Sequence, residues 1–283
     1  MRKYVLPLLL FTVFSAIGVT LWLTKDNLFY LFNFGYIGGA IALGLVLFIK
    51  KYRRARRVTQ LLVGGYMLVY LGLICRENMQ LEGFFYYLFT GVFEAATIHY
   101  AVAKILGPLL FGRGWCGYAC WTAAVLDLLP YKTPQSPRKK LGFLRYIMFS
   151  ASLLFVSALF LAHVGNLEKI MFAAFIVGNV LYYASGVILA FVMRDNRAFC
   201  KYLCPVTVFL KPMSYFSLLR VSCDKSRCVE CGKCREICPM NVDMTDNSRR
   251  RKNGTECILC MECVKVCPKN ALGHGSGKEK TAR

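Results

Sequence analysis

The sequence predicts an all-α transmembrane bundle of about six helices, followed by a small C-terminal α+β domain. Hydrophobic residues make up 57% of the 283-residue chain and charged residues only 18%, a composition typical of membrane proteins. In addition, eight of the fourteen cysteines are confined to residues 228–267, beyond the last apolar segment. We therefore expect a transmembrane domain over residues 1–198, a cysteine-rich domain over 199–272 and a disordered tail over 273–283.

The cysteine-rich region repeats the spacing C-x2-C-x2-C-x3-C-P. This is the spacing of two-cluster bacterial ferredoxins, in which three nearby cysteines hold one 4Fe-4S cluster and the fourth reaches the other. The predicted ligand sets are Cys228, Cys231, Cys234 and Cys267 for the first cluster, and Cys257, Cys260, Cys263 and Cys238 for the second. Zinc sites usually have longer spacers or histidine, and disulfide frameworks belong to small secreted chains, so both alternatives fit less well.

Six apolar segments predict the membrane spans, at residues 4–23, 28–49, 58–75, 84–111, 141–163 and 170–193. The first is too long for the apolar part of a typical signal peptide and has no cleavage motif after it, so we expect it to be retained. The fourth carries Glu94, His99 and Lys104, and is either a full span or a helix partly buried in the bundle. Without it, five spans would place the two ends of the chain on opposite sides.

The net charge of +21 is concentrated in short basic runs beside the apolar segments, such as the run at residues 50–57. Such runs mark cytoplasmic loops, which favours a membrane partner over nucleic acid. With six spans, every strongly basic loop is cytoplasmic. We therefore expect a multi-pass protein of the cell inner membrane, in contact with membrane lipid, with the ferredoxin domain and both termini in the cytoplasm.

Two further cysteine pairs share the spacing C-x3-C: Cys116 with Cys120, and Cys200 with Cys204. Each pair follows an apolar segment at the predicted cytoplasmic face, and a spacing of four places both thiols on one side of a helical turn. Together the pairs offer four soft ligands for a third iron-sulfur cluster, a copper ion or a zinc ion. Alternatively, they are thiols that only pack. The remaining Cys75 is expected to be an inert core residue, and Cys223 is not assigned as a ligand.

The order of these motifs, GRGWCGYAC and CKYLCP followed by the tandem runs, resembles that of the NapH-type membrane ferredoxins and of their NosR-type and CcoG-type relatives. NapH-type proteins are quinol dehydrogenase subunits of periplasmic nitrate reductase systems, and this chain is closest to them in size. The resemblance implies transfer of electrons between quinones and iron-sulfur clusters. The chain departs from the family at Cys120, which is followed by Trp121 rather than proline, and in its larger number of spans.

Iron-sulfur clusters carry single electrons and a membrane holds the two-electron quinone carrier, so we expect an electron-transfer subunit of an oxidoreductase that couples the quinone pool to a redox partner. Quinone chemistry also moves protons, and ionisable residues inside a span are costly and often functional. Glu94 and His99 are therefore candidates for the quinone site, although a spacing of five along a helix points them in different directions. In the alternative, His99 only hydrogen-bonds a neighbouring helix, and Glu94 pairs with Lys104 or Arg113.

A second functional class is a membrane reductase for metal-centre assembly, in which the C-x3-C pairs are the working site. A third is a membrane anchor whose clusters relay electrons for a larger dehydrogenase. The chain has no nucleotide, flavin or NAD motif. The direction of electron flow, the quinone type and the terminal acceptor are left open by the sequence.

Overall fold

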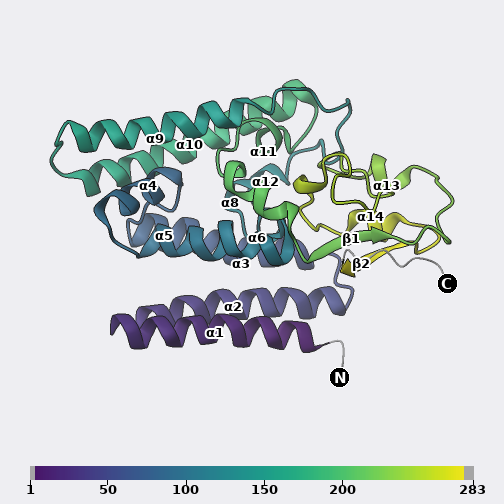
Figure 1. The fold of residues 1–283 in the computed structure, drawn as a ribbon, viewed down its shortest axis with the longest axis horizontal. Coiled ribbons are helices and arrows are strands. Elements are labelled where there is room, and N and C mark those ends of the chain that lie inside the picture. The colour runs from purple at the N-terminus through teal and green to yellow at the C-terminus, as the bar shows by residue number, and fades with distance from the viewer. Residues whose placement is uncertain (1–3, 277–283) are drawn as a thin grey trace.

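A helical bundle forms most of the elongated molecule, and a small cysteine-rich domain forms one end of it (Figure 1). The computed structural model describes residues 4–276. Among these residues, five helices are long and apolar enough to cross a membrane: α1 (Val5–Lys25), α2 (Phe29–Ile49), the continuous helix Ala55–Ile74, α9 (Leu144–Leu161) and α10 (Leu167–Met193). The helix Ala55–Ile74 consists of α3 (Ala55–Gly65) and the π-helix η2 (Tyr66–Ile74).

The fourth predicted span is interrupted, so the expectation of one continuous helix over 84–111 is wrong. The helix α4 (Leu81–Thr90) ends at Gly91, whose φ of 72° lies in the left-handed region that glycine adopts without strain. The chain restarts at Glu94, which has extended backbone. It continues as α5 (Ala95–His99), η3 (Tyr100–Leu106) and α6 (Gly107–Phe111). The helix Ala96–Phe111 is apolar but shorter than the five long ones.

This shorter helix runs from α4 back toward the cysteine-rich domain, and α4 lies at the opposite end of the bundle (Figure 1). We call these two ends the ferredoxin end and the far end. The turn between α1 and α2 lies at the far end, as do the loops that flank α4 and the loop between α9 and α10. The start of α1 and the end of α10 lie toward the ferredoxin end.

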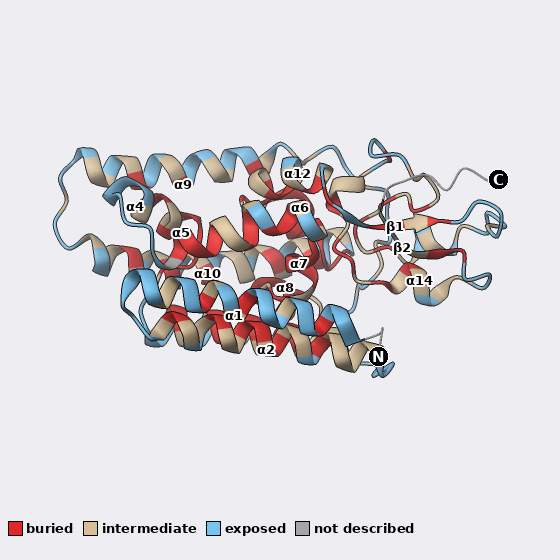
Figure 2. Ribbon diagram, turned by 60° about the horizontal axis from the view of Figure 1, so that its bottom comes forward, coloured by how far each residue is buried: buried red, intermediate tan, exposed pale blue. Residues whose placement is uncertain are grey.

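Small residues allow the helices to approach closely. A Cβ atom on Gly38 of α2 would lie 2.7 Å from the Cβ atom of Phe14 on α1, so a larger residue would force the two helices apart. Figure 2 shows buried residues concentrated in the middle of the bundle, around α5 to α8, while the outer faces of α1, α9 and α10 are exposed. These outer faces carry large apolar side chains such as Leu8, Leu154 and Val180, which suits contact with lipid.

Short helices close the ferredoxin end of the bundle: α7 (Gly114–Tyr118), α8 (Trp121–Leu126), α11 (Ala198–Tyr202) and α12 (Thr207–Tyr215). The predicted boundary at residue 199 would place most of α11 and all of α12 in the C-terminal domain. However, α11 packs on α10, and the ring of Phe209 in α12 lies 5.6 Å from that of Phe84 in α4. Helix α12 thus packs on the bundle and on the C-terminal domain at once, because Lys211 of α12 also lies 3.6 Å from Glu256.

The C-terminal domain is a small α+β unit with a ferredoxin-like arrangement. Strands β1 (Leu219–Cys223) and β2 (Leu272–Ser276) pair in antiparallel register, with Cys223 opposite Leu272. Between them lie α13 (Lys233–Glu236), the 3-10 turn η4 (Gly254–Glu256) and α14 (Glu262–Val266). Residues 273–276, predicted to begin a disordered tail, instead belong to β2 because they pair with β1. The rest of that predicted tail, residues 277–283, lies outside the described residues.

Candidate functional sites

The four cysteines predicted for the first cluster line one cavity. These four are Cys228, Cys231, Cys234 and Cys267. The buried Cys223 also lines this cavity. The sulfur of Cys267 accepts a hydrogen bond from the backbone N–H of Ala271 at 3.3 Å, an interaction that stabilises a thiolate. Backbone donors lower the pKa of Cys267 despite the opposing effect of burial. Because Cys231 is exposed, this first cluster site reaches the protein surface.

A second cavity brings together the other predicted set: Cys238, Cys257, Cys260 and Cys263. The sulfur of Cys238 accepts the backbone N–H of Val242 at 3.3 Å, which matches the role of Cys267 in the other half. This second cluster site is more enclosed, and burial raises the pKa of Cys260 to about 12. The fourth cysteine of each run therefore lies with the first three of the other run, the crossed arrangement that the spacing predicts.

The two C-x3-C pairs meet in a third cavity, at the ferredoxin end of the bundle. We call its four cysteines the third cysteine site: Cys116, Cys120, Cys200 and Cys204. The expectation that each pair shares one side of a helical turn is only partly correct. Cys116 lies in α7, but Cys120 is the N-cap of α8, and Cys204 follows the end of α11. The pairs converge because these short helices pack together, not because of helical periodicity.

Positive charge surrounds the third cysteine site. Lys104 and Arg113 line the cavity, and Arg197 approaches the sulfur of Cys200 at 3.9 Å. Arg113 pairs with Glu256 and Arg197 with Asp127, whereas the buried Lys104 forms no ion pair among the described residues. A buried cation is costly unless an anion compensates it. The site is therefore suited to an anionic group held by thiolates.

Burial makes deprotonation of two of these thiols less favourable. It raises the pKa of Cys200 to about 12 and that of Cys204 to about 11. Metal binding would have to displace these protons, because the thiolate is the ligand. Within residues 4–276, no three His, Cys, Asp or Glu side chains converge tightly enough to hold a single metal ion. The three cysteine sets instead surround cavities, as ligands of a group with several metal atoms would.

The third cysteine site lies directly against the chain of the second cluster site. Gly117, next to Cys116, packs so closely on Ile258, next to Cys257, that a Cβ atom on Gly117 would lie 2.4 Å from the carbonyl oxygen of Ile258. The hydroxyl of Tyr118 donates a hydrogen bond to the carbonyl oxygen of Leu259 at 3.0 Å. The two sites are thus joined by backbone contact.

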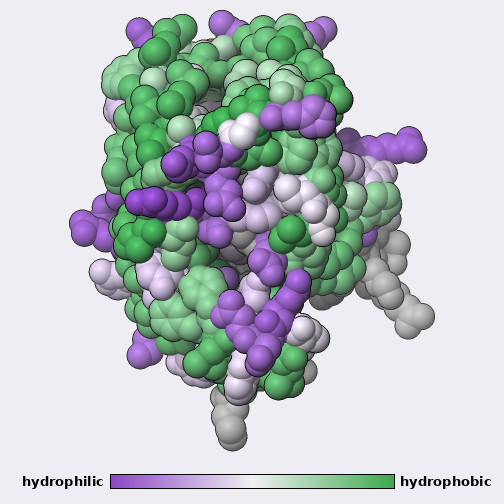
Figure 3. Space-filling model, turned by 90° about the vertical axis from the view of Figure 1, so that its left-hand side faces the viewer, coloured by the Kyte–Doolittle hydropathy of each residue, from purple (hydrophilic) through white to green (hydrophobic). Residues whose placement is uncertain are grey.

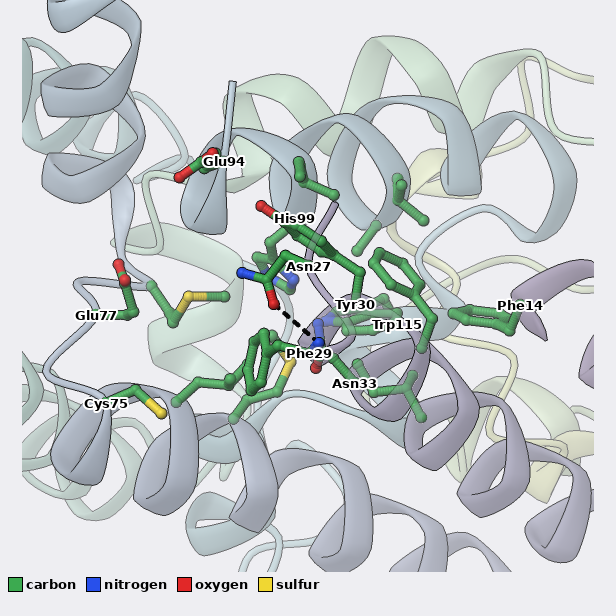
Figure 4. Close-up of a pocket in the computed structure, with 18 residues that line it drawn as sticks. Phe14, Asn27, Phe29, Tyr30, Asn33, Cys75, Glu77, Glu94, His99 and Trp115 are labelled. Atoms are coloured by element: carbon green, nitrogen blue, oxygen red, sulfur yellow. Dashed lines mark hydrogen bonds between the residues drawn. The ribbon is translucent and has the colours of Figure 1, made fainter. Parts of the chain in front are cut away.

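A larger cavity of about 290 Å³ lies among α1, α2, η2 and α5 (Figure 4). We call it the bundle cavity, and its volume is close to the lower end of the range for small-molecule sites. Both Glu94 and His99 line it, together with Glu77, Asn33 and Trp115. The helical spacing that separated Glu94 from His99 does not apply, because Glu94 precedes α5 with extended backbone, and the two residues line the same cavity.

The bundle cavity becomes less exposed with depth. Asn27 and Glu94 are exposed at its far end, Glu77 is half-buried, and His99 and Trp115 are buried at its inner part. Three buried polar atoms there have no hydrogen-bond partner among the described residues: Asn33 Oδ1, His99 Nε2 and Trp115 Nε1. Such atoms are rare in native proteins and call for a partner from outside the chain, either a ligand or water.

Ion pairing at the cavity differs from the sequence-based alternative. Glu94 lies 3.7 Å from Lys25 at the end of α1, not beside Lys104 or Arg113.

Cys75 is exposed and lines the cavity, so its prediction as a core residue is wrong. Asn33 and Trp115 were missed by sequence reasoning. The signal for Asn33 was available, since it is the one amide in an otherwise apolar span.

The inner part of the bundle cavity touches the third cysteine site through Trp115. The ring of His99 lies 5.5 Å from that of Trp115 in an edge-on arrangement, and the ammonium of Lys104 lies 5.2 Å from the Trp115 ring centroid. Trp115 directly precedes Cys116, and Lys104 also lines the third cavity. An apolar cavity, a tryptophan and four cysteines are therefore contiguous.

Together, the fold and these sites define an iron-sulfur protein with candidate membrane spans. Residues 227–272 match the family model of a 4Fe-4S dicluster domain. Residues 100–143 and 170–221, which contain both C-x3-C pairs, match that of a 4Fe-4S binding domain. The chain thus carries iron-sulfur clusters, and the first match fits the expected number of two.

Two curated relatives are similar to most of the chain, both of them uncharacterized proteins of Methanocaldococcus jannaschii. One is 25% identical over 78% of this chain and 86% of its own length, and the other is 26% identical over 61% and 84%. No solved structure matches.

The crossed arrangement predicts which cluster each variant loses. Cys238→Ser should remove the cluster held by Cys257, Cys260 and Cys263, lowering the iron content by about four atoms and leaving the other cluster intact. The measurement is iron analysis combined with EPR of the dithionite-reduced protein, in which coupling between the two clusters should disappear. Cys267→Ser is the matched variant for the other cluster. Loss of the cluster at Cys228 in the Cys238→Ser protein would refute the crossed assignment.

Proposed function

We propose that the chain is a membrane electron-transfer protein that exchanges electrons between a quinone in the bundle cavity and the iron-sulfur clusters of the ferredoxin end. The observation that carries this proposal is the contiguity of the bundle cavity with the third cysteine site through Trp115. The cavity supplies an apolar enclosure for a ring, and His99 Nε2 and Trp115 Nε1 lie free to hydrogen-bond its oxygens.

The cysteine sites of the proposed route follow one another in space. The third cysteine site touches the bundle cavity, the second cluster site touches the third, and the first cluster site has the exposed Cys231. When bound, 4Fe-4S clusters accept and donate single electrons. The protein residues bind the quinone, hold its oxygens and exclude water from the inner cavity. The exposed Cys231 marks where a soluble redox partner or a second subunit would exchange electrons.

We propose a third 4Fe-4S cluster at the third cysteine site. A cluster with four thiolate ligands is anionic, and Lys104 is the buried cation that it would compensate. The match of the 4Fe-4S binding family model over both C-x3-C pairs supports the same assignment. Cys116 and Cys200 are buried, so a client protein could not reach them directly. This enclosure favours electron relay over metal-centre assembly.

The topology that we propose has six passages through the membrane, with the helix Ala96–Phe111 as the fourth. The two ends of the bundle then face opposite sides. The basic run at residues 50–57 lies at the ferredoxin end, which supports a cytoplasmic position of the ferredoxin domain.

The test is to add a reduced menaquinone analogue anaerobically to the cluster-loaded protein in detergent and to follow cluster reduction by EPR. The reverse reaction starts from dithionite-reduced protein and the oxidised analogue. Exchange in either direction is the expected result. The absence of exchange with intact clusters would refute a quinone site in this chain.

His99→Leu should slow this exchange by about tenfold or more. The substitution removes a hydrogen-bonding group in the inner cavity, and a buried hydrogen bond contributes about 1–3 kcal/mol when its partner is left unpaired. The matched control is His163→Leu, because His163 is exposed in the loop between α9 and α10, outside the cavity. Equal rates in the two variants would exclude a role for His99 at the quinone.

A further inference from the structure

The polar mouth of the bundle cavity lies at the far end of the molecule, away from every cysteine of the three sites. Asn27 belongs to the turn between α1 and α2, Glu77 to the loop before α4, and Glu94 to the loop before α5. Figure 1 places all three of these connections at the far end. In Figure 4, Glu77, Glu94 and Cys75 lie on one side of the cavity, and Trp115 and Phe14 lie on the other.

The surface of the far end is polar where the cavity opens. Figure 3 views this end and shows hydrophilic side chains gathered across its middle, bordered by hydrophobic ones. Exposed charged residues of this end include Lys25, Asp26, Arg76, Glu94 and Glu168. An end face of this composition suits contact with water at the membrane surface rather than with the lipid interior.

We infer that the bundle cavity exchanges protons with water at the far end, through Glu94 and Glu77, while electrons leave toward the ferredoxin end. This inference rests on the proposed function and adds a direction to it. Quinone turnover would then move charge across the membrane, because the proton exit and the electron exit lie on opposite sides. The chain would act as one half of a redox loop.

Two carboxylates lie between the cavity and the surface, and they differ in exposure. Glu94 is exposed and lies 3.7 Å from Lys25. Glu77 is half-buried and accepts a hydrogen bond from the hydroxyl of Tyr87. Burial raises the pKa of Glu77, the hydrogen bond from Tyr87 opposes this, and the negative charges of Glu94 and Glu168 raise it further. Other titratable groups near this pair of carboxylates are Lys25, Tyr30, Cys75, Tyr87 and Glu168.

His99 is a titratable group at the inner part of the cavity, away from Glu77 and Glu94. No carboxylate is among the residues that line this inner part. Beyond it stand the indole of Trp115 and the buried Lys104, a cation that disfavours the passage of another positive charge toward the ferredoxin end. The arrangement therefore favours proton exchange between the cavity and the far end, past Glu77 and Glu94, over exchange with the ferredoxin end.

Oxidation of a quinol releases two protons and two electrons, because its two O–H bonds break and its ring oxygens become carbonyls. The two protons pass through the carboxylates to water at the far end. The two electrons pass one at a time to an oxidised one-electron acceptor that docks at the ferredoxin end, reducing two acceptor molecules. In the reverse direction, protons are taken up at the far end.

The experiment uses the full-length, cluster-loaded protein in liposomes that contain a menaquinol and a trapped pH-sensitive dye. Protease accessibility of the ferredoxin domain selects vesicles in which this domain faces outward. Ferricyanide, which does not cross the membrane, is added outside as the acceptor. The control vesicles contain the protein in which all four residues of the third cysteine site are changed to serine. Their rate gives the direct reaction of ferricyanide with quinol.

We expect the vesicle interior to acidify by roughly two protons for each quinol oxidised, and the rate to rise when valinomycin and potassium collapse the membrane potential. An interior that does not acidify, with quinol still oxidised through the protein, would overturn the inference and leave the proposed function standing. Failure of the protein to carry electrons from quinol above the control rate would refute the proposed function, and the inference with it.

The route itself is tested by the double variant Glu77→Gln, Glu94→Gln. It should slow acidification of the interior at least several-fold. Binding of the quinone analogue, measured by quenching of tryptophan fluorescence, should be retained. Asp26→Asn is the matched control, because Asp26 is an exposed carboxylate at the same end that does not line the cavity. Wild-type proton release in the double variant would refute the assignment of these two carboxylates.

Discussion

Replacing all four residues of the third cysteine site by serine should lower the iron content of the anaerobically purified protein from about twelve atoms per chain to about eight. Acid-labile sulfide should fall in parallel. The reason is that Cys116, Cys120, Cys200 and Cys204 converge on one cavity beside Lys104, which has no ion-pair partner within residues 4–276. The same variant should lose quinol-dependent reduction of the two remaining clusters, because the third site lies between them and the bundle cavity.

The control for this prediction is Cys75→Ser. Cys75 is exposed at the far end and does not line the three cysteine cavities, so its replacement should leave iron and sulfide unchanged. An iron content of about eight in both wild type and the quadruple variant would show that the third cysteine site holds no cluster. The route from quinone to the second cluster site would then have to run through Trp115 and Gly117 alone.

The cysteine sets could be predicted from the sequence because their spacing is a covalent constraint. Four thiols within eleven residues can reach one cluster, and the fourth thiol of each run is placed by the pairing of the two halves. The folded domain brings Cys238 and Cys267 to the cavities that this spacing predicts. The spacing alone was therefore enough to group these cysteines as the two cavities do.

The bundle cavity could not be predicted in the same way, because it depends on where a helix is interrupted. Periodicity treats residues 84–111 as one helix and so separates Glu94 from His99. The break at Gly91 removes Glu94 from the helix, and the packing of α2 and η2 then adds Asn33 and Glu77 from distant parts of the chain. Gly91 was the available signal of a helix end, because glycine commonly ends helices.

Glu256 is a further residue that the sequence did not single out, although it directly precedes Cys257. Its carboxylate is buried and contacts the guanidinium groups of three arginines from the bundle and its loops: Arg113, Arg138 and Arg145. Lys211 of α12 lies 3.6 Å from it. Burial and the three arginines lower the pKa of Lys211 to about 8, as expected where cations outnumber the carboxylate. Glu256 is thus one of the points at which the ferredoxin domain is fixed to the bundle, together with the contacts of Gly117 and Tyr118.

Glu256→Ala should therefore strongly destabilise the attachment of the ferredoxin domain to the bundle. Removing one partner from a buried ion pair costs about 3–5 kcal/mol, because the remaining charge is left uncompensated, and both Arg113 and Arg145 are buried. We expect the ferredoxin domain to separate from the bundle, which limited proteolysis between α12 and β1 and thermal unfolding in detergent would detect. The matched control is Glu236→Ala, because Glu236 is an exposed glutamate of the same domain.

The effect of Glu256→Ala on electron transfer separates docking from ligation. The cysteines of the second cluster site are unchanged in this variant, so its two ferredoxin clusters should still assemble and should still be reduced by dithionite. Reduction by quinol should fail, since the contact between Gly117 and Ile258 depends on the docked domain. If the variant kept both its proteolytic resistance and its quinol-dependent reduction, the charge cluster around Glu256 would have no part in joining the domain to the bundle. If the clusters themselves were lost, Glu256 would instead act on the fold of the ferredoxin domain.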